Sequence, residues 1–221
     1  MKLACLHAHY SNISYIEQSL SKDNLELVHF VDPGLMDRLT NDKSFQKLDA
    51  QKKVKDQLEW IANSNVDAIL ITCTNYIALL NEDELSISIP IIKIDEPFFE
   101  AICNIETPQA IVFSNPATVE GTMTRLNQYA KSNAKTIDVE VFIVENSFDL
   151  FMNGLQEEYN QAIAEYLNKM LMEEDKVISV AQLSMVHASQ QVERTSLKKI
   201  INPLQTLSSY MYDNQKRKAV D

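Results

Sequence analysis

Short runs of hydrophobic residues alternate along this chain with longer stretches in which hydrophobic positions recur every three or four residues. Uninterrupted apolar runs are typical of strands buried on both faces of a parallel sheet, and the longer spacing is typical of the amphipathic helices that cover such a sheet. The pattern therefore predicts an α/β fold with parallel sheets. Its clearest strand is the apolar run at 68–71, within the sequence VDAILITCTNY at 66–76.

The polar residues TCTN at 72–75 follow this strand directly, so a thiol, Cys73, lies where the strand gives way to a loop. In open α/β sheets, ligands bind at the carboxyl ends of the strands. Cys73 is therefore a candidate site residue. The alternative is that Cys73 is a small buried hydrophobic residue, as most free cysteines are, and its position alone does not decide between the two.

A second stretch, KVISVAQLS at 176–184, matches DAILITCTN at 67–75 in kind: a charged residue, an apolar run and then a polar strand end. In this alignment of the two stretches, Gln182 has the position of Cys73. The match indicates two similar α/β halves that each bring a strand end to a shared site, although a single match of this length also arises by chance.

The same patterns predict the remaining elements. Strands are expected at 2–6, 25–31, 89–94, 110–113, 139–144, 177–181 and 200–204. Helices are expected at 14–21, 49–64, 95–102 and 157–172, with one more ending near residue 132. The Pro-Gly pair at 33–34 predicts a turn, and the β-α-β unit that leads into the Cys73 strand is expected to be right-handed. We place the first domain at 1–96 plus 204–221 and the second at 97–203.

Charge and hydropathy limit the classes of partner. The 221 residues carry a formal charge of −11, and the one basic cluster is at 215–218, so most of the surface would repel a nucleic acid. No apolar run approaches the roughly 20 residues that a membrane span needs, and the N-terminus does not have the pattern of a signal peptide. We therefore expect a cytoplasmic protein with neither a nucleic-acid partner nor a membrane partner.

Cysteine, glycine and histidine usage limits the chemistry. Three cysteines without CxxC spacing argue against a disulfide framework and a zinc site, and three glycines leave no phosphate-binding glycine motif. Cys5 and Cys103 are expected to pack in the core. His7 and His9 alternate and would share one face of an extended chain. A metal would need a third ligand, and none follows at metal-binding spacing. A hydrogen-bonding role at the site, or simply a place in the loop, is therefore favoured, and neither a metal nor a cofactor is expected.

Other strand ends carry polar residues with two interpretations. Asp95 is either the N-cap of the helix that follows it or a ligand-binding residue. Ser114, Asn115 and Thr118 precede a helix, and the free N–H groups of a first helical turn favour a carboxylate. The same three residues are also ordinary helix caps.

Six motifs occur in an order and spacing that resemble the aspartate/glutamate/hydantoin racemase superfamily over nearly the whole chain. They are His7 after the first strand, VDPGLM at 31–36, TCTNY at 72–76, PIIKIDEP at 90–97, SNPATVEGT at 114–122 and ISVAQLSM at 178–185. The chain most resembles a branch of undefined substrate with an AQxSM-like motif. The resemblance implies two Rossmann-like α/β domains related by a pseudo-twofold axis. It also implies a small carboxylate or amino-acid ligand in the cleft between them, no cofactor, and a homodimer.

Racemases of this superfamily use two cysteines on opposite faces of the substrate carbon. Cys73 occupies the first cysteine position, and Gln182 occupies the second, where an amide cannot accept and return a proton. This departure argues against two-base racemisation. The resemblance also implies a ligand-binding role or a place beside the site for His7, Thr72, Thr74, Asn75, Asp95, Ser114, Asn115, Thr118 and Ser184.

We weigh three functions. The favoured one is an enzyme that acts at the α-carbon of a small carboxylic acid or amino acid through Cys73 alone, by one-base isomerisation, decarboxylation or covalent catalysis. True racemisation would need another second base, His7 or His187. The third function is that of a protein that binds a small carboxylate without turning it over.

Overall fold

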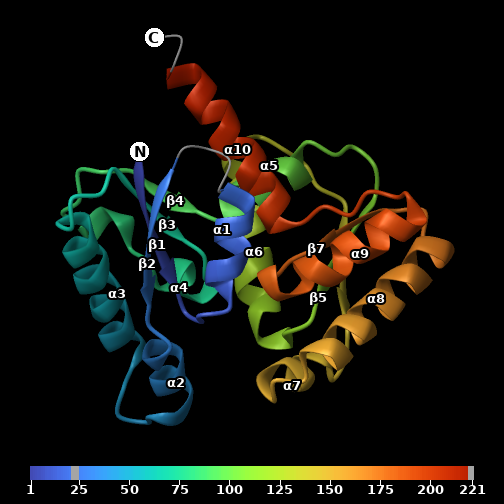
Figure 1. The fold of residues 1–221 in the computed structure, drawn as a ribbon, viewed down its shortest axis with the longest axis horizontal. Coiled ribbons are helices and arrows are strands. Elements are labelled where there is room, and N and C mark those ends of the chain that lie inside the picture. Colours follow the sequence, from blue (N-terminus) through green and yellow to red (C-terminus); the bar gives the residue numbers. More distant parts are fainter. Residues whose placement is uncertain (21–24, 219–221) are drawn as a thin grey trace. The chain divides into compact units, whose positions relative to one another are not determined.

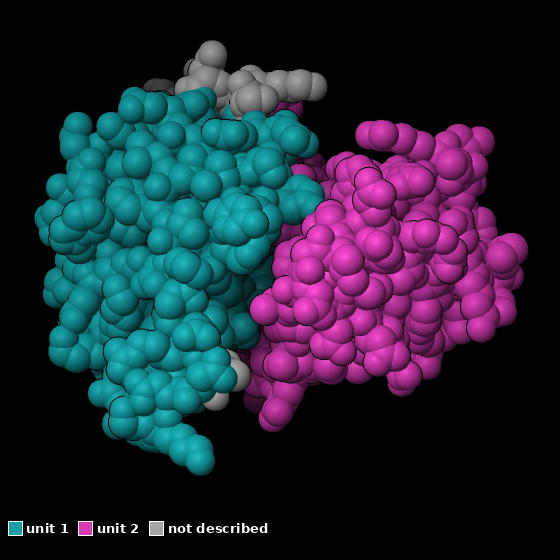
Figure 2. All heavy atoms as spheres, turned by 60° about the horizontal axis from the view of Figure 1, so that its bottom comes forward, with its two compact units in different colours: residues 1–96, 214–221 teal, residues 97–213 magenta. Residues whose placement is uncertain are grey.

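A computed structural model describes residues 1–20 and 25–218 of the chain (Figure 1). The contacts divide the chain into two compact units, of which unit 1 comprises 1–96 and 214–221 and unit 2 comprises 97–213 (Figure 2). Each unit has its own sheet, and every strand pair in both sheets is parallel. The α/β fold with parallel sheets that the hydrophobic pattern predicts is confirmed.

Unit 1 contains a four-stranded sheet in the order β2-β1-β3-β4. The strands are β1 (Lys2–His7), β2 (Glu26–Val31), β3 (Ala68–Ile71) and β4 (Ile91–Lys93). The helices are α1 (Asn12–Leu20), α2 (Gly34–Asn41), α3 (Lys47–Ala62) and α4 (Thr74–Leu79), with a 3-10 turn at Glu82–Glu84. All four residues of the central strand β3 are buried, as its uninterrupted apolar run requires.

Unit 2 contains a three-stranded sheet in the order β6-β5-β7. The strands are β5 (Gln109–Phe113), β6 (Val139–Ile143) and β7 (Val177–Val180). The helices are α5 (Asp95–Cys103), α6 (Val119–Ser132), α7 (Ser147–Met152), α8 (Gln156–Glu173), α9 (Val186–Ser196) and α10 (Pro203–Lys218). The 3-10 turns Pro116–Thr118 and Leu183–Met185 follow β5 and β7.

Strand β5 is apolar throughout its core because it separates two hydrophobic layers. Ala110 and Val112 pack with residues of α8 and α9, and these two helices lie side by side in Figure 1. Ile111 and Phe113 point the other way and pack with residues of α5 and α6. Successive side chains of a strand point to opposite faces. Both faces of β5 are therefore covered, which explains why a continuous apolar run forms a strand here.

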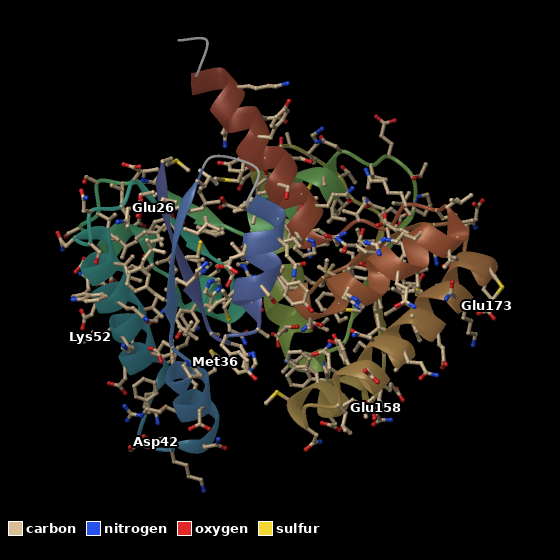
Figure 3. The ribbon with its side chains drawn as sticks, viewed as in Figure 1. Glu26, Met36, Asp42, Lys52, Glu158 and Glu173 are labelled. Carbon is tan, nitrogen blue, oxygen red and sulfur yellow. The ribbon has the colours of Figure 1, made fainter. Side chains whose placement is uncertain are left out.

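Helix α8 shows how an amphipathic helix covers this sheet. Tyr159, Ile163 and Leu167 recur at four-residue spacing and are fully buried. Burying one large aliphatic side chain contributes about 1.5–3 kcal/mol. Charged residues occupy the other faces, and Glu158 and Glu173 mark the two ends of the helix in Figure 3. The predicted helix at 157–172 is confirmed to within a residue at each end.

Three local predictions are wrong, two of them because of proline. The pair at 33–34 does not form a turn: Pro33 has φ −75° and ψ −18°, already in the helical region, and α2 begins at Gly34, consistent with the fixed φ of proline suiting a helix start. The expected strand at 200–204 is a single bridge between Ile201 and Ser179. Pro203, which lacks an N–H group, begins α10 instead. Asp95 is the first residue of α5 rather than the N-cap before it.

The chain also contains helices that the hydrophobic pattern does not predict, namely α2, α4, α7 and α9. The contacts assign residues 203–213 of α10 to unit 2, whereas the sequence analysis assigns the chain from residue 204 onward to the first domain. Within residues 1–20 and 25–218, every helix is too short or too polar to cross a bilayer.

Candidate functional site

Cys73 lies at the end of strand β3, in unit 1. It is the N-cap of α4, with an extended backbone at φ −109° and ψ 118°, and its carbonyl oxygen accepts a hydrogen bond from the Ile77 N–H at 3.1 Å. The side chain is half-buried. The thiol is thus held by a defined backbone at the carboxyl edge of the sheet, which is where ligands bind in this class of fold.

Thr74 and Asn75 form the first turn of α4 and are half-buried. Among the residues that the structure describes, their side chains have no hydrogen-bond partner. A hydroxyl group and an amide group are therefore available for a ligand beside Cys73, as the sequence analysis expects.

Thr72 is used differently, because it is buried and its hydroxyl joins β3 to β1. The Thr72 hydroxyl lies 3.1 Å from the Leu6 carbonyl oxygen and 2.8 Å from His7 Nδ1. The Asn12 side-chain amide donates to the same hydroxyl at 3.4 Å. Thr72 therefore organises the strand ends behind Cys73, and its hydroxyl group is already satisfied within unit 1.

His7 is the last residue of β1 and is fully buried. Its Nε2 lies 2.9 Å from Nδ1 of His29 on β2, so both ring nitrogens of His7 have partners. Burial lowers the pKa of His7 to about 4, and the neighbouring His29 adds to that shift. Burial also lowers the pKa of His29, against an opposing effect of Glu17. Both imidazoles are therefore neutral near pH 7.

His9 does not share a face with His7. Strand β1 ends at His7, so His9 lies in the following loop, where it is exposed and its Nδ1 lies 2.8 Å from the Ser11 hydroxyl. The expectation that the two histidines face one way is wrong, because it assumes an extended chain through residue 9.

Tyr76 connects the Cys73 loop to the end of β2. Its side chain is fully buried, and its hydroxyl donates to the Asp32 carbonyl oxygen at 2.8 Å. Burial raises the pKa of Tyr76 well above its ordinary value, and the negative charges of Asp32 and of a Cys73 thiolate act in the same direction. Tyr76 is therefore a neutral hydrogen-bond donor that fixes the start of α4.

Gln182 lies at the end of β7, in unit 2. Its Oε1 accepts three hydrogen bonds, from Ser114 N–H at 2.7 Å, Ser114 Oγ at 2.9 Å and Asn115 N–H at 3.0 Å. The oxygen and nitrogen of an amide are distinguished by such partners. The three donors thus fix the oxygen toward the end of β5 and leave the NH₂ group of Gln182 as a hydrogen-bond donor.

Tyr159 extends this cluster into the core. Its hydroxyl donates to Ser114 Oγ at 2.9 Å and lies 2.8 Å from Ser184 Oγ. The side chain of Tyr159 is fully buried. The cluster is therefore a line of hydroxyl groups that ends on the amide oxygen of Gln182.

Ser114, Asn115 and Thr118 do not present the open carboxylate grip that their positions suggest. The Ser114 and Asn115 N–H groups are occupied by Gln182. Asn115 Oδ1 accepts from Ala117 N–H at 3.0 Å, and Thr118 Oγ1 donates to the Asn115 carbonyl oxygen at 2.9 Å. Capping and strand-end hydrogen bonds thus account for all three residues.

The other predicted residues lie outside the two groups just described, the one around Cys73 and the one around Gln182. Asp95 is buried in the first turn of α5. His187 is exposed on α9 and, among the described residues, no hydrogen bond joins it to the Gln182 cluster. Cys5 and Cys103 are buried, as expected for core residues. Burial raises the pKa of the Cys5 thiol to about 12 and also raises that of Cys103, which a nearby Lys135 partly opposes.

Sequence reasoning missed His29, Asn12 and Tyr159. The place of His29 opposite Cys5 depends on the register of β1 with β2, which local sequence does not set. A signal existed for Tyr159, which lies in the predicted helix at 157–172, one helical turn before the buried Ile163. That signal does not identify the partner of the Tyr159 side chain.

We compared the chain with known proteins. No family model matches the sequence, and no curated protein matches it either. Three of the solved structures that it resembles are racemases. The Picrophilus torridus aspartate racemase has a TM-score of 0.69 at 11% identity, over 96% of this chain and 93% of that chain.

The glutamate racemase from Francisella tularensis subsp. tularensis SCHU S4, in complex with D-glutamate, has a TM-score of 0.66 at 18% identity, over 99% of this chain and 82% of that chain. The allantoin racemase from Klebsiella pneumoniae has a TM-score of 0.64 at 16% identity, over 96% of this chain and 86% of that chain. At these identities the likeness is one of fold. The chain therefore has the α/β fold of the aspartate, glutamate and allantoin racemases, as its resemblance to the aspartate/glutamate/hydantoin racemase superfamily implies.

Proposed function

We propose that this protein is a cofactor-independent enzyme that acts at the α-carbon of a small carboxylic acid or amino acid, with Cys73 as its acid–base group or nucleophile. The observation that carries the proposal is the place of Cys73: a half-buried thiol on the carboxyl edge of a buried parallel strand. Thr74 and Asn75 beside it have polar groups that no described residue uses. The racemase fold makes α-carbon chemistry the natural reaction class.

The proposed step is proton transfer at a carbon next to a carboxylate. The Cys73 thiolate takes the α-proton, so the C–H bond breaks, an S–H bond forms, and the electron pair moves into the carboxylate as an enediolate. Hydrogen-bond donors must stabilise that developing charge. The Thr74 hydroxyl and the Asn75 amide are the donors that lie next to the thiol in sequence and in the first turn of α4. Return of that proton to the same face restores the substrate and gives only exchange with solvent; a net isomerisation requires the enediolate to turn its other face to Cys73 or to accept the proton at a different atom.

Gln182 supports chemistry by one thiol rather than two. An amide does not exchange protons at neutral pH, and the oxygen of Gln182 is already engaged by three donors. Its NH₂ group is the part that a ligand carboxylate would bind. His7 is an unsuitable second base, because both of its ring nitrogens have partners inside unit 1.

The test is proton exchange in heavy water. Amino, hydroxy and dicarboxylic acids are incubated with the protein in D₂O, and α-deuterium is read by mass spectrometry. We expect exchange in at least one acid, and a loss of about 100-fold or more in Cys73→Ser, which is the usual contribution of a positioned acid–base group. Cys103→Ser is the matched control. Exchange that persists in Cys73→Ser would contradict the proposal.

A second function is favoured by one observation. Gln182 occupies the position of the second cysteine, and its fixed oxygen leaves an NH₂ group that can donate to a carboxylate but cannot transfer a proton, as expected if turnover were lost and binding retained. A non-catalytic carboxylate-binding protein would give the same ligand-induced rise in melting temperature in wild type and Cys73→Ala, and no exchange in any acid. Exchange by the wild type excludes this function.

A further inference from the structure

Three potential metal ligands converge on strands β1 and β2 of unit 1. Cys5 and His7 are two residues apart on β1 and so point to one face of the sheet. His29 on β2 is paired in register with Cys5. The Cys5 sulfur and one ring nitrogen from each histidine lie within 4.8 Å of one another. We propose that these three residues bind one transition-metal ion, with zinc as the reference ion. The proposal does not depend on the function proposed for Cys73.

The hydrogen bonds around the two imidazoles favour a cation between them. His7 Nε2 and His29 Nδ1 face each other at 2.9 Å. On the outer side of His7, the Thr72 hydroxyl can direct its proton to the Leu6 carbonyl oxygen at 3.1 Å. Its oxygen then accepts a hydrogen bond from the N–H group at His7 Nδ1, 2.8 Å away. In this arrangement His7 Nε2 carries a lone pair that points at His29.

The surroundings of His29 also favour the tautomer whose lone pair points toward the other imidazole. His29 Nε2 is buried without a hydrogen-bond partner, and a carboxylate oxygen of Glu17 lies 3.7 Å from it. A carboxylate only accepts hydrogen bonds, so it favours the tautomer with its proton on Nε2. The Nδ1 lone pair then also points inward. In the metal-free protein the 2.9 Å contact between the two nitrogens is a hydrogen bond and needs a proton on one of them; a metal ion would take the place of that proton and bind both lone pairs.

The outer partner of His29 is of the kind that metal-binding histidines have in known sites. A ligating histidine almost always donates its other N–H to a carboxylate, a carbonyl oxygen or a water molecule, which fixes its tautomer. Glu17 is the carboxylate for His29, and because it projects from α1 with an exposed side chain, a small movement would bring it into hydrogen-bond range. Thr72 has the equivalent place for His7.

The ligand set selects the class of metal. One thiolate and two imidazoles suit Zn²⁺ and other borderline or soft ions, and do not suit Mg²⁺ or Ca²⁺, which prefer oxygen. With zinc bonds of about 2.3 Å to sulfur and 2.0–2.1 Å to nitrogen, neighbouring tetrahedral ligands are about 3.3–3.6 Å apart. The two nitrogens, 2.9 Å apart, must therefore separate by about 0.4 Å, and the sulfur must approach them by about 1.2 Å at most, both of which are small side-chain movements. The bound ion would link β1 to β2 and hold His7 against Thr72.

The test uses protein freed of metal by EDTA and then dialysed. We expect calorimetry to show one Zn²⁺ bound per chain, and Co²⁺ to give a near-ultraviolet thiolate-to-metal charge-transfer band. Cys5→Ser should lose the band, and His29→Gln should lose tight binding. Cys73→Ser, Cys103→Ser and His9→Ala are controls that should keep both.

Because Cys5 lies in the core, Glu17→Gln provides a variant on the surface. Loss of an outer-shell partner typically weakens metal affinity 10–100-fold, so Glu17→Gln should weaken zinc binding by about 10-fold while circular dichroism stays unchanged. The proposal is overturned if the wild type binds no stoichiometric zinc. It is also overturned if binding is unchanged in both His29→Gln and Glu17→Gln, or if the cobalt band is lost in Cys73→Ser and retained in Cys5→Ser.

Discussion

Strand β3 of unit 1 and strand β7 of unit 2 each contain four residues, and in both units the second residue after the strand is the N-cap of a short helical turn. That N-cap is Cys73 in unit 1, with φ −109° and ψ 118°, and Gln182 in unit 2, with φ −126° and ψ 144°. The two backbones are nearly the same, so the match between residues 67–75 and 176–184 is confirmed within each unit.

The two strand ends differ in what their side chains do. The residues after Cys73, Thr74 and Asn75, keep their polar groups free of described partners. Gln182 instead has its oxygen bound by three donors, and the hydroxyl line through Tyr159 stabilises that arrangement. One backbone geometry thus supports a half-buried thiol in unit 1 and a fixed amide in unit 2. This difference predicts that the two ends respond differently to alkylation, acid and substitution.

The largest expected effect is on alkylation. In the folded protein at neutral pH, iodoacetamide should label Cys73 at least about 1,000-fold faster than Cys5, because a thiol in a core strand reacts only through opening of the structure. Cys103 should also react slowly, since it is buried. Mass spectrometry of peptides over time measures the three rates, and urea-unfolded protein provides the reference. Equal labelling rates of Cys73 and Cys5 in the folded protein would contradict the expected difference in their exposure.

Acid should next destabilise unit 1 through its buried histidines. In the unfolded chain His7 takes up a proton near pH 6.5, whereas in the folded chain burial lowers its pKa to about 4. The unfolded state therefore binds more protons between these values, and the free energy of unfolding falls as pH decreases from about 6.5 to 4. His7 alone contributes about 3 kcal/mol to this loss.

Urea unfolding of the EDTA-treated protein across this pH range measures the effect. The variant His7→Gln cannot titrate and should show a flatter pH dependence. His9→Gln is the matched control, because His9 is exposed and should leave the profile unchanged. A wild-type stability that does not change between pH 6.5 and 4 would show that His7 is not held neutral by burial.

Substitution of Gln182 should separate stability from ligand binding. Gln182→Leu leaves the N–H groups of Ser114 and Asn115 without an acceptor, so it should lower the free energy of unfolding by about 1–3 kcal/mol. Gln182→Glu keeps an acceptor for these donors but replaces the NH₂ group by a negative charge. It should keep most of the stability and lose ligand-induced stabilisation by small carboxylates. Urea unfolding and thermal shift measure the two properties, and a fully stable Gln182→Leu would contradict the role of these hydrogen bonds.

The smallest expected effect is on Tyr159. Tyr159→Phe removes the hydroxyl that connects Ser114 with Ser184 and should cost about 1 kcal/mol. Tyr166→Phe is the matched control on the same helix, because Tyr166 has no hydrogen-bond partner among the described residues. If the two variants unfold at the same urea concentration, the Tyr159 hydroxyl contributes nothing to the cluster.

The sequence predicts strands better than it predicts their partners. Runs such as 68–71 and 110–113 are continuous and apolar because they are covered on both faces, so their pattern identifies them directly. The turn at 33–34 and the strand at 200–204 are wrong because a proline in each has a backbone role that hydropathy does not record.

The site is predictable only in part for a related reason. Cys73 and Gln182 are found because each follows a recognisable strand. The use of the Gln182 oxygen is not found, because it depends on the exact distance between two neighbouring strand ends. The His7–His29 contact similarly depends on strand register, and register is set by packing in three dimensions rather than by local sequence.

The Gln182 cluster has one further consequence. The groups that surround its amide oxygen are a serine hydroxyl and two backbone N–H groups, and neither these nor the amide gain or lose a proton between about pH 4 and 9. The electrostatic potential that this cluster presents is therefore constant over the physiological range. Any acid or alkaline limb in the activity of the protein must originate elsewhere in the chain.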